Sequence, residues 1–153
     1  MKKNRVVLFV SFLLVLGAWP LFAQSNALID ELLAEKTASF GKAAYLALAA
    51  AQLVPEDASI EQTLAVLQEK GWKIRPRGAE EPIKLGEYSL LLMKGFNLQG
   101  GLMYRLAHGP RYAARELAYL KLLPGKPDPT RSLSGEEAVR ILSSLLNWKE
   151  GKS

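Results

Sequence analysis

Hydrophobic residues recur at helical spacing along most of the chain, and the alternation typical of half-buried strands is hard to find. The clearest stripe follows Ser134, with apolar side chains three and four positions apart at Ala138, Ile141, Leu142, Leu145 and Leu146. Ser134 and, three positions on, Glu137 have the spacing of a capping box, which predicts a helix that begins there. The pattern therefore predicts an all-α fold.

Five more helices are predicted upstream, over residues 25–35, 42–54, 59–71, 86–96 and 110–123. Ser25 or Asn26 is the expected cap of the first. The second is rich in alanine, so we place it at the centre, because small side chains let neighbouring helices approach closely. Residues 72–82 hold two prolines and a glycine and predict a loop, and Gly100-Gly101 predicts a flexible break.

The first 23 residues have the order of an export signal. Three basic residues near the start precede an apolar run over residues 6–16, and the small Ala23 follows. The run is shorter than the roughly 20 residues that cross a bilayer as a helix, which argues against an uncleaved anchor. We predict cleavage after Ala23, export to the periplasm or cell envelope, and a single helical domain over residues 24–153 without a transmembrane span.

Composition and charge narrow the function. The chain has no cysteine, so it forms no disulfide and carries no lipid on an N-terminal cysteine. Loss of Lys2, Lys3 and Arg5 with the signal lowers 20 basic residues to 17 against 15 acidic ones, and the net charge from +5 to +2. A charge of this size does not indicate a nucleic-acid partner.

Catalytic and metal-binding motifs are missing from the sequence. It has no nucleophile elbow, phosphate-binding glycine loop or zinc-protease motif, and its single histidine comes without cysteine. We predict a protein that is not an enzyme and has no cofactor. A wall-active hydrolase remains a third alternative, because the geometry of paired glutamates is not visible in a sequence.

Two helix-loop-helix units resemble each other. They cover residues 59–101 and 102–150, and Glu87 and Glu137 fall in register fifty positions apart. Residues 24–58 are left as an N-terminal helical pair. The prediction is therefore a six-helix orthogonal bundle made of two similar units and this pair.

The second unit resembles a surface-layer homology (SLH) repeat, whose second helix opens with a motif of the Leu-Thr-Arg-Ala-Glu type. The matching residues are 133–137 (Leu-Ser-Gly-Glu-Glu), and residues 83–87 (Ile-Lys-Leu-Gly-Glu) match in the first unit. Leu85 and Gly135 stand where the motif has arginine. The resemblance implies non-covalent attachment to a cell-wall polymer. Its repeat-motif residues here are Lys84, Glu87, Ser134 and Glu137; the alternative is that Ser134 and Glu137 only cap a helix.

A local excess of positive charge marks residues 88–115, which include no acidic residue. Arg111 falls in the first turn of a predicted helix, where the helix dipole disfavours a cation, and Arg115 lies four positions on, where like charges repel. A nearby anion would explain both arginines. The candidate ligand-binding residues are Arg105, His108, Arg111, Tyr112 and Arg115.

Three interpretations of these residues remain open. In the first, the arginines are solvated or pair with Glu116, Glu136 or Glu87 of the same chain. In the second, they hold an anionic wall polymer or another anionic ligand. In the third, the protein is a periplasmic scaffold or adaptor that docks an acidic protein partner through this surface. An adaptor predicts an exposed apolar patch beside the arginines, whereas a polymer site predicts a polar groove.

Overall fold

The computed structural model describes residues 20–152, and it describes side chains from Asn26 onward. These residues contain seven α-helices. They are α2 (Pro20–Ala34), α3 (Phe40–Ala50), α4 (Ile60–Glu69), α5 (Leu85–Gly95), α6 (Leu102–Ala107), α7 (Pro110–Tyr119) and α8 (Gly135–Glu150). Within these residues there is no strand, only two isolated β-bridges, Ser39 to Pro82 and Lys84 to Ser132. The predicted all-α class is confirmed.

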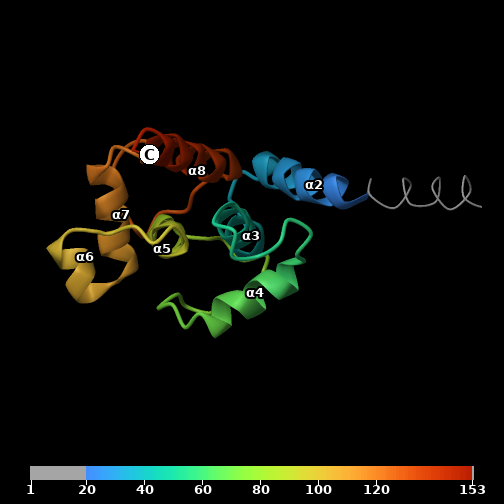
Figure 1. The fold of residues 1–153 in the computed structure, drawn as a ribbon, viewed down its shortest axis with the longest axis horizontal. Helices are drawn as coiled ribbons and strands as arrows, with labels where there is room; N and C mark the ends of the chain where they lie inside the picture. Colours follow the sequence, from blue (N-terminus) through green and yellow to red (C-terminus); the bar gives the residue numbers. More distant parts are fainter. Residues whose placement is uncertain (1–19, 153) are drawn as a thin grey trace, which may run out of the picture.

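Three helices, α3, α5 and α8, supply most of the core. The side chains of α5 are buried at every position from Leu85 to Met93. In α3 the buried alanines keep the helix thin, so α4, α5 and α8 all pack against it, in agreement with its predicted central place. Figure 1 shows α3 and α5 end-on at the centre, with α4 below and α8 above.

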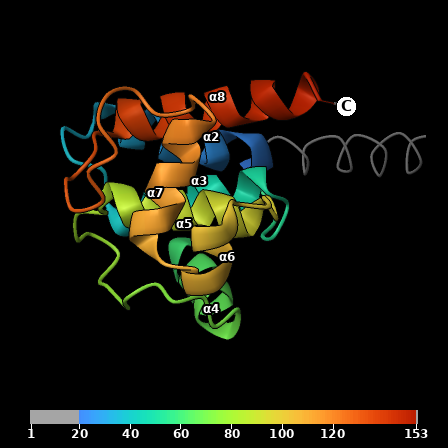
Figure 2. The same cartoon turned by 90° about the vertical axis from the view of Figure 1, so that its left-hand side faces the viewer.

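The helices form three units that each consist of an outer helix, a loop and an inner helix. The units are α2 with α3, α4 with α5, and α7 with α8. Each outer helix packs against the inner helix of another unit: α4 against α3, α7 against α5, and α2 against α8. The units therefore close into a ring in which the first described helix lies against the last (Figures 1 and 2).

Extended segments before the three inner helices hydrogen-bond to one another in all three pairings. We call residues 35–42, 77–87 and 129–137, which include the first residues of each inner helix, the three-segment junction. Its links include the Phe40 amide to the Glu81 carbonyl at 2.7 Å, the Leu85 amide to the Arg131 carbonyl at 2.9 Å, and the Ala38 amide to the Leu133 carbonyl at 2.8 Å. Because buried backbone groups need partners, each unit depends on the other two.

Glycine is required where two of these segments meet. A Cβ on Gly135 would lie 1.6 Å from the Leu32 carbonyl oxygen, and a Cβ on Gly86 would lie 2.8 Å from the Cβ of Pro129. The Gly135 amide donates to the Glu35 carbonyl at 3.0 Å. The start of α8 is thus in direct backbone contact with the end of α2.

Helices α3, α5 and α7 end in the same way, with a left-handed residue followed by leucine. The left-handed residues are Gln52, Asn97 and Lys121, with φ of 57°, 49° and 59°. After α5, for example, the Leu98 amide donates to the Met93 carbonyl at 2.8 Å. This bond satisfies a carbonyl of the last turn and reverses the chain with a non-glycine residue in place of the usual glycine.

The grouping of the helices differs from the prediction. The two N-terminal helices are not an addition to two repeats, because α2 and α3 form a third unit with the same arrangement as the others. The structure also holds a helix that the sequence did not predict, α6, where a connection after Gly100-Gly101 was expected. Six residues are too few to show a hydrophobic period.

The start of the first helix was also predicted wrongly. Ser25 and Asn26 were expected to cap it, but both lie inside α2 (Pro20–Ala34). Cleavage after Ala23 would leave α2 as residues 24–34. Residues 1–19 of the predicted signal lie outside the described residues.

Candidate functional site

The predicted ligand-binding residues lie on α6, on α7 and at the turn between them. Arg105 is on α6, His108 is the C-cap of that helix, and Arg111, Tyr112 and Arg115 are on α7. The two helices lie side by side on one side of the molecule (Figure 2). The question is which of these side chains face a common space.

Helix α6 is anchored by one side chain. Tyr104 is 4% exposed, and burial, followed by the negative charge of Glu116, raises its pKa to about 12, so the phenol stays neutral. A Cβ on Gly100 would lie 2.4 Å from the Cδ1 atom of the Tyr104 ring, so the chain before α6 passes too close for a larger residue. This contact fixes α6 although the helix is short.

His108 ends α6 in the left-handed conformation, with φ of 42° and ψ of 39°. Its amide donates to the Tyr104 carbonyl at 2.7 Å, and the two rings are tilted with centroids 5.5 Å apart. His108 therefore lies in the turn between α6 and α7 and is half-buried against a tyrosine. Its ring faces the same space as Arg105.

That space is a cavity of about 340 Å³ between the end of α5 and α6, which we call the basic cavity. Its lining consists of Met93, Lys94, Asn97, Leu98, Gln99, Gly100, Tyr104, Arg105 and His108. It thus combines two cations, an imidazole and two side-chain amides, and it includes no acidic residue. Such a set can donate several hydrogen bonds to an anion.

The other three predicted residues lie outside this lining. Arg111 and Arg115 are exposed and four positions apart, so they share one face of α7. Tyr112 is partly buried and packs against the hydrophobic core. The structure thus brings Arg105 and His108 together and leaves the two α7 arginines on a separate, open surface.

The carboxylates considered as internal partners bind elsewhere or lie apart. Glu87 pairs with Arg77, Glu136 pairs with Arg140, and no ion pair of Glu116 occurs within the described part of the chain. Within residues 20–152, none of the five basic side chains, Lys94, Arg105, His108, Arg111 and Arg115, forms an ion pair either. Internal pairing therefore does not account for the basic stretch.

Lys94 belongs to the cavity although it was not among the candidate residues. The signal for it was present in the sequence, because Lys94 lies in the same stretch without acidic residues. Asn97 and Gln99 had no such signal. They reach the cavity because the left-handed turn at Asn97 brings the chain after α5 back toward α6, and only the fold reveals that turn.

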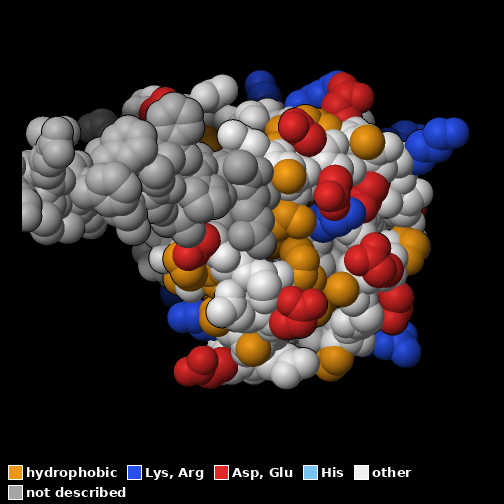
Figure 3. Space-filling model, turned by 90° about the vertical axis from the view of Figure 1, so that its right-hand side faces the viewer, with side chains coloured by type: hydrophobic (Ala, Val, Ile, Leu, Met, Phe, Trp, Pro, Cys, Tyr) orange, Lys and Arg blue, Asp and Glu red, His pale blue; other side chains and the backbone are white. Residues whose placement is uncertain are grey.

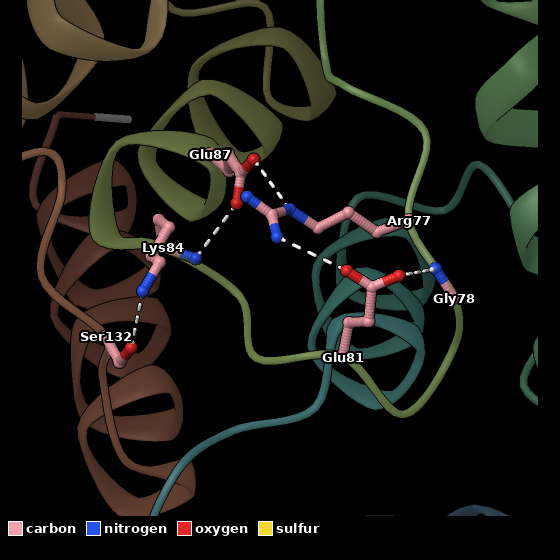
Figure 4. A network of polar contacts seen from close by, with 6 residues as sticks. All are labelled: Arg77, Gly78, Glu81, Lys84, Glu87 and Ser132. Atoms are coloured by element: carbon pink, nitrogen blue, oxygen red, sulfur yellow. Dashed lines mark hydrogen bonds and ion pairs between the residues drawn. The ribbon is translucent and has the colours of Figure 1, made fainter.

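The repeat-motif residues lie in the three-segment junction and bind other residues of the chain. The Glu87 carboxylate accepts the Lys84 amide at 3.0 Å and the Arg77 Nε at 2.9 Å, and the Lys84 Nζ donates to the Ser132 Oγ at 3.0 Å. Figure 4 shows Arg77 between Glu87 and Glu81. Lys84 therefore joins the α4–α5 unit to the α7–α8 unit, whereas the contacts of Glu87 stay within its own unit.

In the α7–α8 unit, the contacts at the start of the inner helix differ from those in the α4–α5 unit. Ser134 Oγ accepts the Glu137 amide at 3.1 Å, as expected of a helix cap. The Glu137 carboxylate was expected to return to the Ser134 amide, but it is bound by both terminal nitrogens of Arg131 instead. A nearby guanidinium group forms stronger bonds with a carboxylate than a single amide does.

In the α2–α3 unit the corresponding ion pair has its cation and its carboxylate in the reverse order along the chain. Glu35, which precedes the helix, accepts the Ser39 amide at 2.7 Å, and Lys42 inside the helix donates to it at 2.9 Å. In the other two units the carboxylate is inside the helix and arginine precedes it. This reversal of charge is one reason why the sequence did not show that α2 and α3 form a unit like the other two.

A second, more apolar cavity of about 210 Å³ lies between α4 and the loop before α5. Trp72, Leu64 and Ile74 line it together with Arg75 and Arg77. The sequence indicated only a loop over residues 72–82. Arg77 is committed to Glu87 and Glu81, which leaves this cavity with fewer free polar groups than the basic cavity.

Residues 20–152 contain no group of three or more histidine, cysteine, aspartate or glutamate side chains able to hold a metal ion. None of the helices described is both long and apolar enough to cross a membrane. No protein-family model, curated protein or solved structure matches the chain.

Proposed function

We propose that this protein is an exported, non-enzymatic binding module of the cell envelope, and that its basic cavity holds an anionic wall polymer or another anionic ligand. The observation that carries the proposal is the lining of that cavity, in which Lys94, Arg105 and His108 share one space without an acidic residue, while none of the three forms an ion pair within residues 20–152. Unpaired cations beside a cavity favour an anion from outside the chain.

The chemistry of the lining supports a phosphate or carboxylate group. Arg105 offers a planar, forked donor, Lys94 a compact charge, and the amides of Asn97 and Gln99 add neutral donors. The resemblance to SLH repeats, which implies attachment to a wall polymer, narrows the ligand class. Wall polymers carry such groups at intervals, so one cavity per molecule would hold one group of the polymer.

The proposal is tested by sedimentation with purified, lipid-free peptidoglycan sacculi and their attached polymers at graded salt. Wild-type protein is expected to pellet at low salt and to be released as salt rises. The affinity of the Lys94→Glu, Arg105→Glu variant for the sacculi is expected to fall about tenfold or more, because charge-assisted hydrogen bonds are lost and repulsion is gained. Lys126→Glu is the matched control, since Lys126 is exposed in the loop before α8, outside the cavity lining.

Two results would overturn the proposal. One is wild-type protein that stays in the supernatant at low salt. The other is a folded double variant, judged by its circular dichroism, that binds as wild type does.

An adaptor function is a second candidate, favoured by the outer face of α7. Arg111, Arg115 and Tyr119 lie four positions apart on this helix, all exposed, and Tyr119 is 83% exposed. Arginine and tyrosine are enriched at protein interfaces. Recovery of one stoichiometric acidic protein from envelope extract, lost with Arg111→Glu, Arg115→Glu and kept with Lys126→Glu, would favour the adaptor.

A further inference from the structure

Helix α6 displays a cluster of apolar side chains that the fold leaves uncovered. Leu102, Met103 and Leu106 are 66%, 59% and 72% exposed, and they account for most of the large exposed hydrophobic residues in the described chain. At about 100° per residue, these three side chains lie within an arc of about 100° on one side of the helix. Tyr104 points the opposite way, into the core.

The apolar face is held in place and does not collapse onto the protein. The buried ring of Tyr104 anchors the inner side of α6, and the His108 amide caps its end. Figures 1 and 2 show α6 at the periphery of the molecule, beyond α5 and beside α7. A short anchored helix therefore presents three apolar side chains outward.

Positive charge borders this face. Arg105 lies next to Leu102 around the helix, and Lys94 lines the cavity behind it. Neither cation is paired within residues 20–152. The far side of the molecule, in Figure 3, carries acidic side chains interspersed with lysines and arginines over its described part. The cations near α6 have no acidic residue beside them in the cavity lining, so they favour an approach of α6 toward negative charge.

We propose that α6 docks the protein on the surface of an anionic lipid bilayer. Leu102, Met103 and Leu106 would enter the boundary between headgroups and acyl chains, while Arg105 and Lys94 contact lipid phosphates. This combination of a few projecting apolar side chains and a cationic border is typical of shallow interfacial binding.

Two other occupants fit the observations less well. A protein partner needs roughly 800 Å² on each side, whereas α6 is about 9 Å long and convex, and three side chains cover much less. A second copy of this chain, docked through the same face around a two-fold axis, would place two copies of Arg105 at one small interface to which α6 contributes no carboxylate. A fluid lipid surface requires neither a large matching area nor a complementary shape.

The test is co-sedimentation with vesicles, using the processed, exported protein. One set of vesicles contains about 30% phosphatidylglycerol in phosphatidylcholine, and the other contains phosphatidylcholine alone. Wild-type protein is expected to bind the anionic vesicles, to bind the neutral ones much more weakly, and to be released by salt.

The variants identify the surface. Leu102→Gln, Leu106→Gln is expected to weaken vesicle binding about tenfold or more, since buried leucine side chains are lost. Leu33→Gln is the matched control, because Leu33 is also an exposed leucine, 41% exposed, and belongs to α2, which lies across the molecule from α6. All variants share the same N-terminal sequence, so a difference reports α6.

Three results would overturn the inference: no binding to anionic vesicles, equal binding by the α6 variant, or an α6 variant that instead loses self-association or a stoichiometric protein partner. Failure of the proposed anion site would be recognised in a separate measurement, the binding to sacculi. Lipid-free sacculi should still bind the Leu102→Gln, Leu106→Gln variant and should not bind the Lys94→Glu, Arg105→Glu variant.

Discussion

The three-segment junction and the α6–α7 side of the molecule treat charge in opposite ways. At the junction each unit pairs a cation with a carboxylate: Lys42 with Glu35, Arg77 with Glu87, and Arg131 with Glu137. On the α6–α7 side, Arg105, Arg111 and Arg115 are exposed and form no ion pair among the described residues. The fold therefore accounts for the charged residues of the junction, whereas the arginines on the α6–α7 side are available to bind a partner from outside the chain.

The strongest test of the junction is Gly135→Ala. The new Cβ would overlap the Leu32 carbonyl oxygen at 1.6 Å, so α2 and α8 must separate. We expect a loss of about 3 kcal/mol or more in the free energy of unfolding, measured with urea. Gly109→Ala is the control on the α6–α7 side, because its Cβ would lie 3.7 Å from the nearest carbonyl oxygen. Equal stability of the two variants would show that the ring of units is not closed at Gly135.

The next test compares a paired charge with an unpaired one. Glu87→Ala removes the acceptor of Arg77 Nε and of the Lys84 amide, and Glu87 itself is only 7% exposed. We expect it to lower the free energy of unfolding by about 2 kcal/mol. Arg111→Ala should change it by less than about 0.5 kcal/mol, because the side chain is exposed and has no ion pair in residues 20–152. A larger loss in Arg111→Ala would reverse the comparison.

The smallest expected effect concerns pH. Burial opposes ionisation of Glu35, but its hydrogen bonds from Lys42 and Ser39 outweigh burial and lower its pKa below the ordinary value of 4.5. The folded protein therefore releases this proton more readily than the unfolded chain, so the stabilisation is present above pH 4.5 and is lost as pH falls through the lower folded value.

Glu35→Gln should therefore flatten the acid limb of the stability curve by about 1 kcal/mol or less, as measured by urea unfolding between neutral pH and pH 3. Arg111→Gln should leave the shape of that limb as in wild type, because Arg111 is exposed and forms no ion pair within residues 20–152. An acid limb unchanged by Glu35→Gln would mean that the Glu35 contacts contribute nothing to the fold.

Much of the helical structure was predictable because its signals are local. Ser59 and Gln62 form the reciprocal capping box that their spacing predicts, and the α8 stripe is buried at Ala138, Ile141, Leu142 and Leu145. At Glu137 the local rule was only half right, because Arg131 competes for the carboxylate. A cap is readable in a sequence when no charged neighbour reaches it.

The candidate site was predictable in part. The absence of acidic residues in 88–115 indicated a local excess of positive charge but left open whether its cations pair within the chain, and among residues 20–152 they form no ion pair. It did not separate Arg105 and His108, which face the basic cavity, from Arg111 and Arg115, which do not. That separation depends on α6, a helix held by a tertiary contact of Tyr104.

Six of the seven described helices, several of their ends and the accumulation of positive charge were predictable from the sequence alone, because spacing, caps and charge act over a few residues. The tertiary structure was needed to show that the N-terminal helices form a third unit and that backbone hydrogen bonds join the three segments. It was also needed to show which cations of the described residues form no ion pair. Those outcomes depend on groups far apart in the chain, and a carboxylate can pair with whichever cation the fold brings within reach.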